Sequence, residues 1–261
     1  MPEPTPTSGP ASSHLRVERP SEGVALLVLD NPGQRNAMSD AMTAAWVAAV
    51  DELAADRSLR AVVVTGEGSA FCAGGDTSWI ASEPDASVDH LRTRMMAFYR
   101  AWLSIRKLEV PTIAAVNGPA IGAGTQLAIA CDLRVADETA RFAVPTARNG
   151  MAVDGWTIRT LAMLAGTGRA RRLMLAADSL DRDESLAAGL ADRAGTLDDA
   201  LAWAQEVAEL APLALAHNKL VLNGGNDEAV NASFEAVWAS DDVREAAAAR
   251  SEKRAPNFTG Q

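Results

Sequence analysis

FCAGGD at residues 71–76 and NGPAIGAG at residues 117–124 are the two stretches of sequence that decide the fold of this chain. An apolar, β-branched run at residues 62–65 leads toward the first stretch, and a second run at residues 112–116 leads into the other. Residues with little or no side chain allow a backbone N–H to approach a ligand closely. Two such turns, if they converge, predict a pair of N–H donors that can hold a developing oxyanion.

The segments around these turns alternate between strand and helix patterns. Short apolar runs predict buried strands at residues 24–29, 61–65, 112–116 and 133–136. Periodic apolar positions predict helices at residues 39–55, 89–106 and 125–130, and further helices from about residue 198 onward. Alternation of this kind is typical of an α/β architecture. The helix after the second turn would add its N-terminal dipole to the oxyanion site.

Charge and composition exclude several classes of protein. The chain has 261 residues, is 48% hydrophobic and carries a formal net charge of -10. This acidic balance argues against a nucleic-acid-binding protein, which needs a basic patch to neutralise phosphates. No apolar run in the sequence is long enough to span a membrane. Residues 1–13 are rich in Pro, Ser and Thr, so we expect a disordered N-terminal tail rather than a signal peptide, and hence a cytoplasmic protein.

The cysteines and histidines give no sign of a metal site or a thiol nucleophile. Cys72 and Cys131 lie in apolar or turn segments, which is typical of buried free thiols. His14, His90 and His217 lie outside the motif segments and have no zinc-binding spacing to the cysteines. We therefore expect neither a metal nor cysteine catalysis.

Taken in order along the chain, the motif segments resemble those of the enoyl-CoA hydratase/isomerase superfamily, also called the crotonase superfamily. The family's first turn usually has the form F-x-A-G-A-D, and its second A-V-N-G-x-A-x-G-G-G, and both turns match. Further matches are NPGQRNA at 31–37, CDLRVA at 131–136 and EKRAPNF at 252–258. The resemblance runs from about residue 24 to residue 258 and covers nearly the whole chain.

The resemblance implies an α/β fold, a crotonase-type spiral of ββα units followed by a C-terminal helical region that drives trimer formation. On this basis we expect residues 14–197 to form the spiral core with the CoA site, and residues 198–261 to form the trimerisation region. The implied assembly is a homotrimer or a dimer of trimers. The implied ligand is a CoA thioester, with no permanently bound cofactor. The backbone N–H groups of Gly75 and Ala123 would form the oxyanion hole.

Two positions depart from the hydratases of this superfamily, in which two glutamates activate water. Gln126 stands where the first glutamate is expected, and Thr146 stands after FAVP at residues 142–145, where the second is expected. An amide and a hydroxyl can hydrogen-bond, but neither accepts a proton usefully near neutral pH. Homology alone predicts a hydratase, whereas these two residues predict poor hydration.

Asp154 is a remaining carboxylate, at a position that some relatives use in chemistry. The resemblance suggests that it could move protons, as in dienoyl-CoA isomerases, or act as a nucleophile, as in a dehalogenase. Its place before Gly155 and an apolar run also favours a helix N-cap. The sequence leaves catalysis and capping open as alternatives.

CoA binding requires cations for the phosphates and a flat surface for the adenine. By resemblance, Arg35, Ala73 and Gly75 lie in elements that meet the nucleotide and the thioester. Lys253 and Phe258 belong to the C-terminal tail, which in the family reaches the CoA of a neighbouring subunit. The alternatives are a solvated arginine and an ordinary surface helix end.

The acyl pocket is expected around residues 77–98, a stretch that varies within the superfamily. Its candidate lining residues are the large apolar side chains Trp79, Ile80, Met95, Met96 and Tyr99. Methionines suit a flexible acyl chain but suit a protein core equally well, so the acyl length does not follow from the sequence.

Three functions are compatible with these residues. The first is a protein of lipid metabolism that binds fatty acyl-CoA without efficient hydratase activity, as in an actinobacterial subgroup with similar residues, and that could serve a partner in lipid synthesis. The second is an active CoA-thioester enzyme, such as an isomerase, hydrolase or decarboxylase, that uses Asp154. The third is a weak enoyl-CoA hydratase with water held by Gln126 and Thr146.

Overall fold

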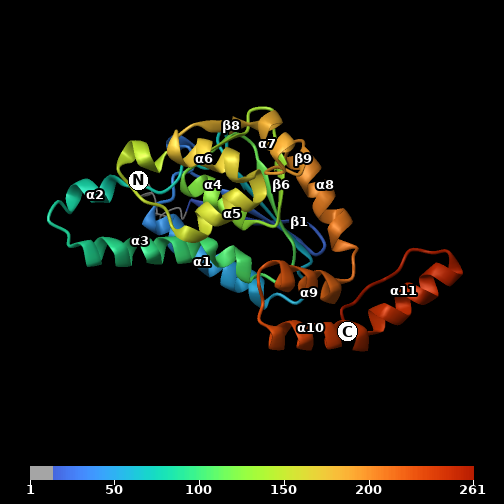
Figure 1. Ribbon diagram of the computed structural model, residues 1–261. Coiled ribbons are helices and arrows are strands. Elements are labelled where there is room, and N and C mark those ends of the chain that lie inside the picture. Colours follow the sequence, from blue (N-terminus) through green and yellow to red (C-terminus); the bar gives the residue numbers. More distant parts are fainter. Residues whose placement is uncertain (1–13) are drawn as a thin grey trace, which may run out of the picture.

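A computed structural model describes residues 14–261, and its centre is a six-stranded sheet (Figure 1). The strands, in spatial order, are β1 (Leu15–Ser21), β2 (Val24–Leu29), β3 (Ala61–Gly66), β4 (Thr112–Val116), β6 (Leu133–Ala136) and β9 (Arg193–Ala194). Strand β1 is antiparallel to β2, and the remaining neighbours pair in parallel. Strands β2, β3 and β4 are buried along their whole length, as continuous apolar runs in a parallel sheet usually are. The tail expected at residues 1–13 lies outside the described residues.

A second, smaller sheet carries the second turn. Its strands are β5 (Pro119–Ile121), β7 (Arg141–Ala143) and β8 (Ser179–Asp181). Strand β5 pairs in parallel with β7, which pairs in antiparallel fashion with β8. These three-residue strands were not anticipated, because they are too short to show a periodic pattern.

The alternation of side chains along the large sheet creates two apolar cores. The register-paired residues of the first core are Leu27, Val64 and Ala114. The residues that precede each of them face the second core, and these are Leu26, Val63 and Ile113. Helix α8 (Leu197–Ala208) covers the second core with Ala200 and Ala204. The first core is the larger one, and it supports the two turns because Phe71, Cys72 and Leu127 belong to it.

The remaining helices follow the sequence pattern with small differences at their ends. They are α1 (Asp40–Ala55), α2 (Ser78–Ser82), α3 (Val88–Trp102), α4 (Ala123–Ala130), α5 (Gly155–Ala165), α6 (Thr167–Leu175) and α7 (Arg182–Ala188). The expected helix at residues 89–106 ends earlier, at Trp102, and continues as a 3-10 helix over Leu103–Lys107. Helix α4 begins at Ala123, before the expected start at Thr125. Within residues 14–261, no helix is both long and apolar enough to cross a membrane.

Three C-terminal helices extend from one end of the molecule (Figure 1). They are α9 (Pro212–Leu222), α10 (Asp227–Ala239) and α11 (Asp241–Glu252). Lys219 anchors α9 to the core, because its Nζ lies 2.7 Å from Asp132 Oδ2 and donates to the Val110 carbonyl at 2.8 Å. Large apolar side chains nevertheless remain exposed on these helices, among them Phe234 and Trp238. Such a surface suits contact with another subunit.

Candidate active site

The two small-residue turns lie against each other. Cys72 donates its backbone N–H to the Pro119 carbonyl at 3.1 Å and accepts a hydrogen bond from the Ile121 N–H at 2.9 Å. Glycine is required at residue 124, because a Cβ there would lie 2.2 Å from the Cys72 carbonyl oxygen. Gly74 has a φ of +99°, and a Cβ on it would approach the Ile121 carbonyl oxygen to 2.7 Å. Backbone contact this close is possible only with small residues.

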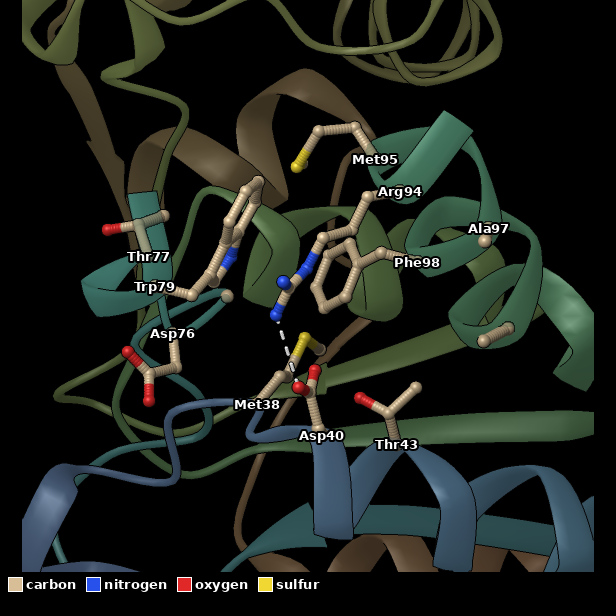
Figure 2. A pocket seen from close by; sticks show the side chains of 12 residues that line it. Met38, Asp40, Thr43, Asp76, Thr77, Trp79, Arg94, Met95, Ala97 and Phe98 are labelled. Carbon is tan, nitrogen blue, oxygen red and sulfur yellow. Dashed lines mark hydrogen bonds and ion pairs between the residues drawn. The ribbon is translucent and has the colours of Figure 1, made fainter. Parts of the chain in front are cut away.

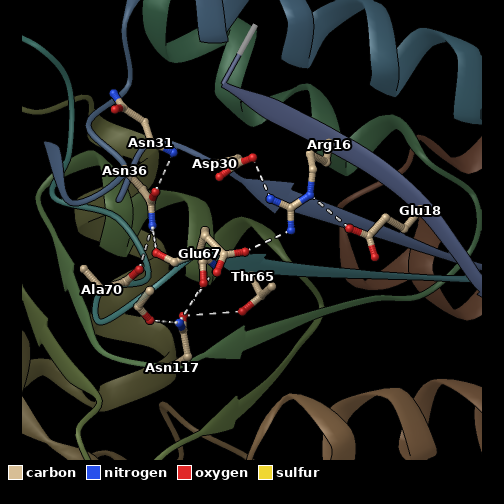
Figure 3. Close-up of polar contacts among 11 residues, drawn as sticks. Arg16, Glu18, Asp30, Asn31, Asn36, Thr65, Glu67, Ala70 and Asn117 are labelled. Atoms are coloured by element: carbon tan, nitrogen blue, oxygen red, sulfur yellow. Dashed lines mark hydrogen bonds and ion pairs between the residues drawn. The ribbon is translucent and has the colours of Figure 1, made fainter. Parts of the chain in front are cut away.

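Two asparagines fix the loop that leads into the first turn (Figure 3). Asn36 is fully buried, and its side-chain amide donates to the carbonyls of Glu67 at 3.0 Å and Ala70 at 2.8 Å. Asn117 donates to the Gly66 carbonyl at 2.7 Å. Both asparagines lie in the motif segments, yet their positioning role was missed, because the sequence does not show which carbonyls they reach.

The candidate oxyanion donors are the backbone N–H groups of Gly75 and Ala123. Ala123 is the first residue of α4, so its N–H has no carbonyl partner inside the helix. In the described part of the chain, no protein acceptor binds the N–H of either residue. Both groups are therefore free to donate to a ligand, and the helix dipole strengthens the donor at Ala123.

Gln126 and Asp154 meet at the start of α5. The Gln126 Nε2 atom lies 2.5 Å from Asp154 Oδ2 and 2.7 Å from Thr157 Oγ1. Asp154 is the N-cap of α5, because its Oδ1 accepts the Thr157 N–H at 3.0 Å, while its Oδ2 also accepts the Thr157 hydroxyl at 2.6 Å. The carboxylate thus accepts three hydrogen bonds, and its geometry is that of a helix N-cap. Thr146, the other replaced position, begins a separate 3-10 helix, Thr146–Asn149.

Tyr99 is close enough to Asp154 to feel its charge, and it is not among the residues that line the cavity beside Gly75. Its hydroxyl is 3.1 Å from the Ala152 carbonyl oxygen, to which it donates. Burial, and then the negative charge of Asp154, raise the pKa of Tyr99 to about 12. The phenol therefore stays protonated near neutral pH.

A cavity of about 330 Å³ lies beside Gly75 (Figure 2). Its apolar lining includes Met38, Trp79, Met95 and Phe98, and its polar lining includes Asp40, Thr43 and Arg94. Of the acyl-pocket candidates, Trp79 and Met95 line this cavity. Ile80 and Met96 do not, and they are 37% and 43% exposed. The sequence did not distinguish them because adjacent positions on a helix point in different directions.

The structure brings only part of the expected CoA site together. The Arg35 carbonyl accepts the Ala73 N–H at 2.9 Å, so Arg35, Ala73 and Gly75 are close in space. Lys253 ends α11, which lies at the opposite end of the molecule from α2 (Figure 1), and Phe258 belongs to the tail that follows. The Phe258 carbonyl there accepts a hydrogen bond from Arg60. Within one subunit, these two tail residues do not reach the turns.

The cysteines and acidic groups do not form an additional reactive centre. Burial raises the pKa of both Cys72 and Cys131 to about 12, so neither forms a thiolate readily near neutral pH. The backbone N–H and hydroxyl of Ser78 lower the pKa of Asp76. Over residues 14–261, no group of His, Cys, Asp and Glu is arranged to hold a metal ion.

Comparison of the sequence with known proteins identifies the family to which the chain is similar. The family model described as enoyl-CoA hydratase/isomerase matches residues 19–261. The chain is 44% identical over 245 residues to the probable enoyl-CoA hydratase echA6 of Mycobacterium tuberculosis, with 92% of this chain and 97% of the relative covered.

Solved structures agree with the sequence comparison. An enoyl-CoA hydratase from Bacillus anthracis superposes with a TM-score of 0.85 at 25% identity, covering 95% of this chain and 100% of that one. A probable enoyl-CoA hydratase/isomerase from Mycobacterium abscessus gives a TM-score of 0.81 at 30% identity, covering 95% and 99%. The likeness confirms the predicted α/β crotonase fold, which has two sheets and C-terminal helices.

Proposed function

This chain belongs to the enoyl-CoA hydratase/isomerase family, and from that premise we propose that it binds fatty acyl-CoA thioesters without hydrating them efficiently. The observation that carries the proposal is the cluster of Gln126, Asp154 and Thr157 next to the free N–H of Ala123. Gln126 follows Ala123 by three positions on α4, so the two lie on the same side of the helix.

Hydration of an enoyl thioester needs a base for the attacking water and an acid for the carbon that receives a proton. Gln126 and Thr146 supply neither. Three hydrogen bonds, from the amide of Gln126 and from the hydroxyl and N–H of Thr157, already engage the carboxylate of Asp154. Binding needs none of these proton transfers, because the N–H groups of Gly75 and Ala123 would hold the thioester carbonyl.

A second candidate function rests on Asp154. Its carboxylate is oriented by two neighbouring side chains, as a positioned acid or base would be. An isomerase, hydrolase or decarboxylase acting on a CoA thioester would use it together with the same oxyanion donors. A weak hydratase would instead need water held by Gln126 and Thr146.

We also propose a subgroup, an oligomeric state and a cellular location for this protein. Replacement of both glutamates supports an actinobacterial, acyl-CoA-binding subgroup that acts in lipid metabolism, with a possible protein partner in lipid synthesis. The exposed apolar side chains of α10 support a homotrimer or a dimer of trimers. In such an assembly, Lys253 and Phe258 of one subunit would reach the CoA bound to a neighbouring subunit. Arg35 of that neighbouring subunit would bind the same CoA. Because CoA thioesters are the proposed ligands, we place the protein in the cytoplasm.

The test compares binding of a saturated acyl-CoA with binding of free CoA by calorimetry. Ala123→Pro removes one oxyanion donor, and proline is well accepted at the first position of a helix. Loss of one hydrogen bond should weaken thioester binding by up to about tenfold, while free CoA binding is unchanged. Absence of acyl-CoA binding by the unaltered protein would refute the proposal.

The variant Asp154→Asn distinguishes an enzyme that uses Asp154 from a protein that only binds the thioester. Asparagine is also a good N-cap, so the variant should keep α5 intact. If Asp154 is catalytic, the variant loses turnover of a CoA thioester and keeps its binding. If Asp154 only caps the helix, the variant binds and behaves like the unaltered protein.

A further inference from the structure

Arg94 joins three separate elements at the wall of the cavity (Figure 2). Its Nη1 lies 2.8 Å from Glu83 Oε1, just after α2, and its Nη2 lies 3.2 Å from Asp40 Oδ2, at the start of α1. The guanidinium also stacks on Trp79 of α2, 3.9 Å from the ring centroid. One side chain on α3 therefore holds α2 over the cavity.

Helix α2 has few other polar ties to the molecule. Its backbone hydrogen bonds are local, from the Ile80 N–H to the Thr77 carbonyl and from the Glu83 N–H to the Ile80 carbonyl. Apart from the Arg94 contacts, the polar side-chain tie that the described residues show from this segment to α3 is the 2.7 Å contact between Glu83 and His90. The position of α2 thus depends heavily on Arg94.

These contacts lie at the solvent side of the cavity. The Asp40 side chain lines the cavity and is 91% exposed. Gly75, whose N–H has no protein acceptor among the described residues, lines the same cavity beside Phe98. An acyl chain whose thioester carbonyl is held at Gly75 would therefore extend toward the residues that Arg94 holds together.

We propose that Arg94 is the residue that sets acyl-chain length, because its contacts hold α2 against the cavity and so limit how far a bound chain extends. This inference rests on the proposed acyl-CoA binding and names the ligand class of that site as short- and medium-chain thioesters. A volume of about 330 Å³ is at the small end of ligand pockets. A longer chain gains from burying its extra methylenes only if α2 moves and the Arg94 contacts break.

The charge balance excludes a different role for Arg94. A cation inside an acyl pocket could pair with a carboxylate at the far end of a dicarboxylic acyl chain. The guanidinium, however, is already bound by the two carboxylates of Asp40 and Glu83. It offers no unbalanced charge, so it serves as a closure rather than as a ligand for an anion.

The experiment measures dissociation constants for hexanoyl-CoA and palmitoyl-CoA with the full-length protein. Arg94→Met keeps an apolar side chain of similar length and removes the charge. Two solvent-screened ion pairs and a cation–π contact no longer oppose opening, so palmitoyl-CoA should bind up to about fivefold more tightly relative to hexanoyl-CoA. The control is Arg92→Met on the same helix, since Arg92 pairs with Asp89 in solvent and does not line the cavity.

The outcomes separate this inference from the function on which it rests. An unchanged ratio in Arg94→Met, or an equal change for both thioesters, would overturn the role of Arg94. Failure of the unaltered protein to bind either thioester would instead overturn the proposed function. Glu83→Gln, which removes one of the two ion pairs and keeps the stacking, should shift the ratio in the same direction by less. Thermal unfolding of each variant verifies that the fold is kept.

Discussion

The first turn and the wall formed by α2 and α3 border the same cavity, yet the two turns and this wall are held in opposite ways. The turns are fixed by backbone hydrogen bonds, by glycines at close contacts, by the buried amide of Asn36 and by the half-buried amide of Asn117. The wall is fixed by part-exposed side chains around Arg94. The difference indicates that the part proposed to hold the thioester is rigid, whereas the part proposed to meet the acyl chain is adjustable.

Gly124→Ala should have the largest effect on stability, because it breaks the contact between the turns. The new Cβ would lie 2.2 Å from the Cys72 carbonyl oxygen, so the backbone must move. We expect a loss of about 3 kcal/mol or more in the free energy of unfolding, measured by chemical denaturation. Gly168→Ala is the control, since a Cβ there meets nothing within 4 Å. A loss below that of ordinary surface variants would show that the turns are not in tight contact.

Asn36→Ala should come next in size. It leaves the carbonyls of Glu67 and Ala70 without their side-chain donor, and Ala is less suited than Asn to the φ of 57° at this position. We expect a loss of about 2–4 kcal/mol in the free energy of unfolding. Asn149→Ala, at the exposed end of the 3-10 helix Thr146–Asn149, is the matched control and should be nearly neutral. Equal effects of the two variants would refute the role of Asn36.

The ionisation of Tyr99 can be measured by its absorbance as the pH is raised, because Tyr99 is the one tyrosine of the chain. Its phenolate absorbance should titrate near pH 12 rather than near the usual 10. Because the unfolded chain loses this proton first, the contribution of Tyr99 to stability is full below pH 10 and is lost as the pH rises toward 12. Asp154→Asn removes a nearby negative charge and should lower the midpoint. A midpoint near 10 in the folded protein would contradict the burial of this phenol beside Asp154.

Arg94→Met should have the smallest effect on stability. The Arg94 side chain is 29% exposed, and its partner Asp40 is 91% exposed, so solvent screens their attraction. We expect a change of less than about 1 kcal/mol in the free energy of unfolding, even though ligand selection changes. A loss as large as that of Asn36→Ala would mean that the wall is as much a part of the core as the turns are.

Sequence alone predicted the turns because their constraint is local and steric. A run of small residues after a buried strand also suits the packing of a helix on a sheet, so Gly75 and Ala123 were assigned as donors through the resemblance to the family. The long strands β2, β3 and β4 were equally clear, since each is a continuous apolar run. Strand β1 was missed because most of its residues are exposed and its sequence is rich in polar residues.

The wall could not be predicted for the opposite reason. Asp40, Glu83 and Arg94 are ordinary surface charges in the sequence, and Asp40 is 54 positions from Arg94. Only the folded chain brings them together. The pairing of Gln126 with Asp154 depends in the same way on how α4 and α5 meet, so the sequence identified both residues but not their hydrogen bond.

The most direct test of the account is mass spectrometry of 2-enoyl-CoA and saturated acyl-CoA thioesters after incubation with the protein. We predict that both thioesters are recovered unchanged and that they remain bound when the protein is isolated under native conditions. Efficient conversion of the enoyl thioester to a product heavier by one water would contradict the account, because it would show that hydration proceeds with Gln126 and Thr146 in place of both glutamates.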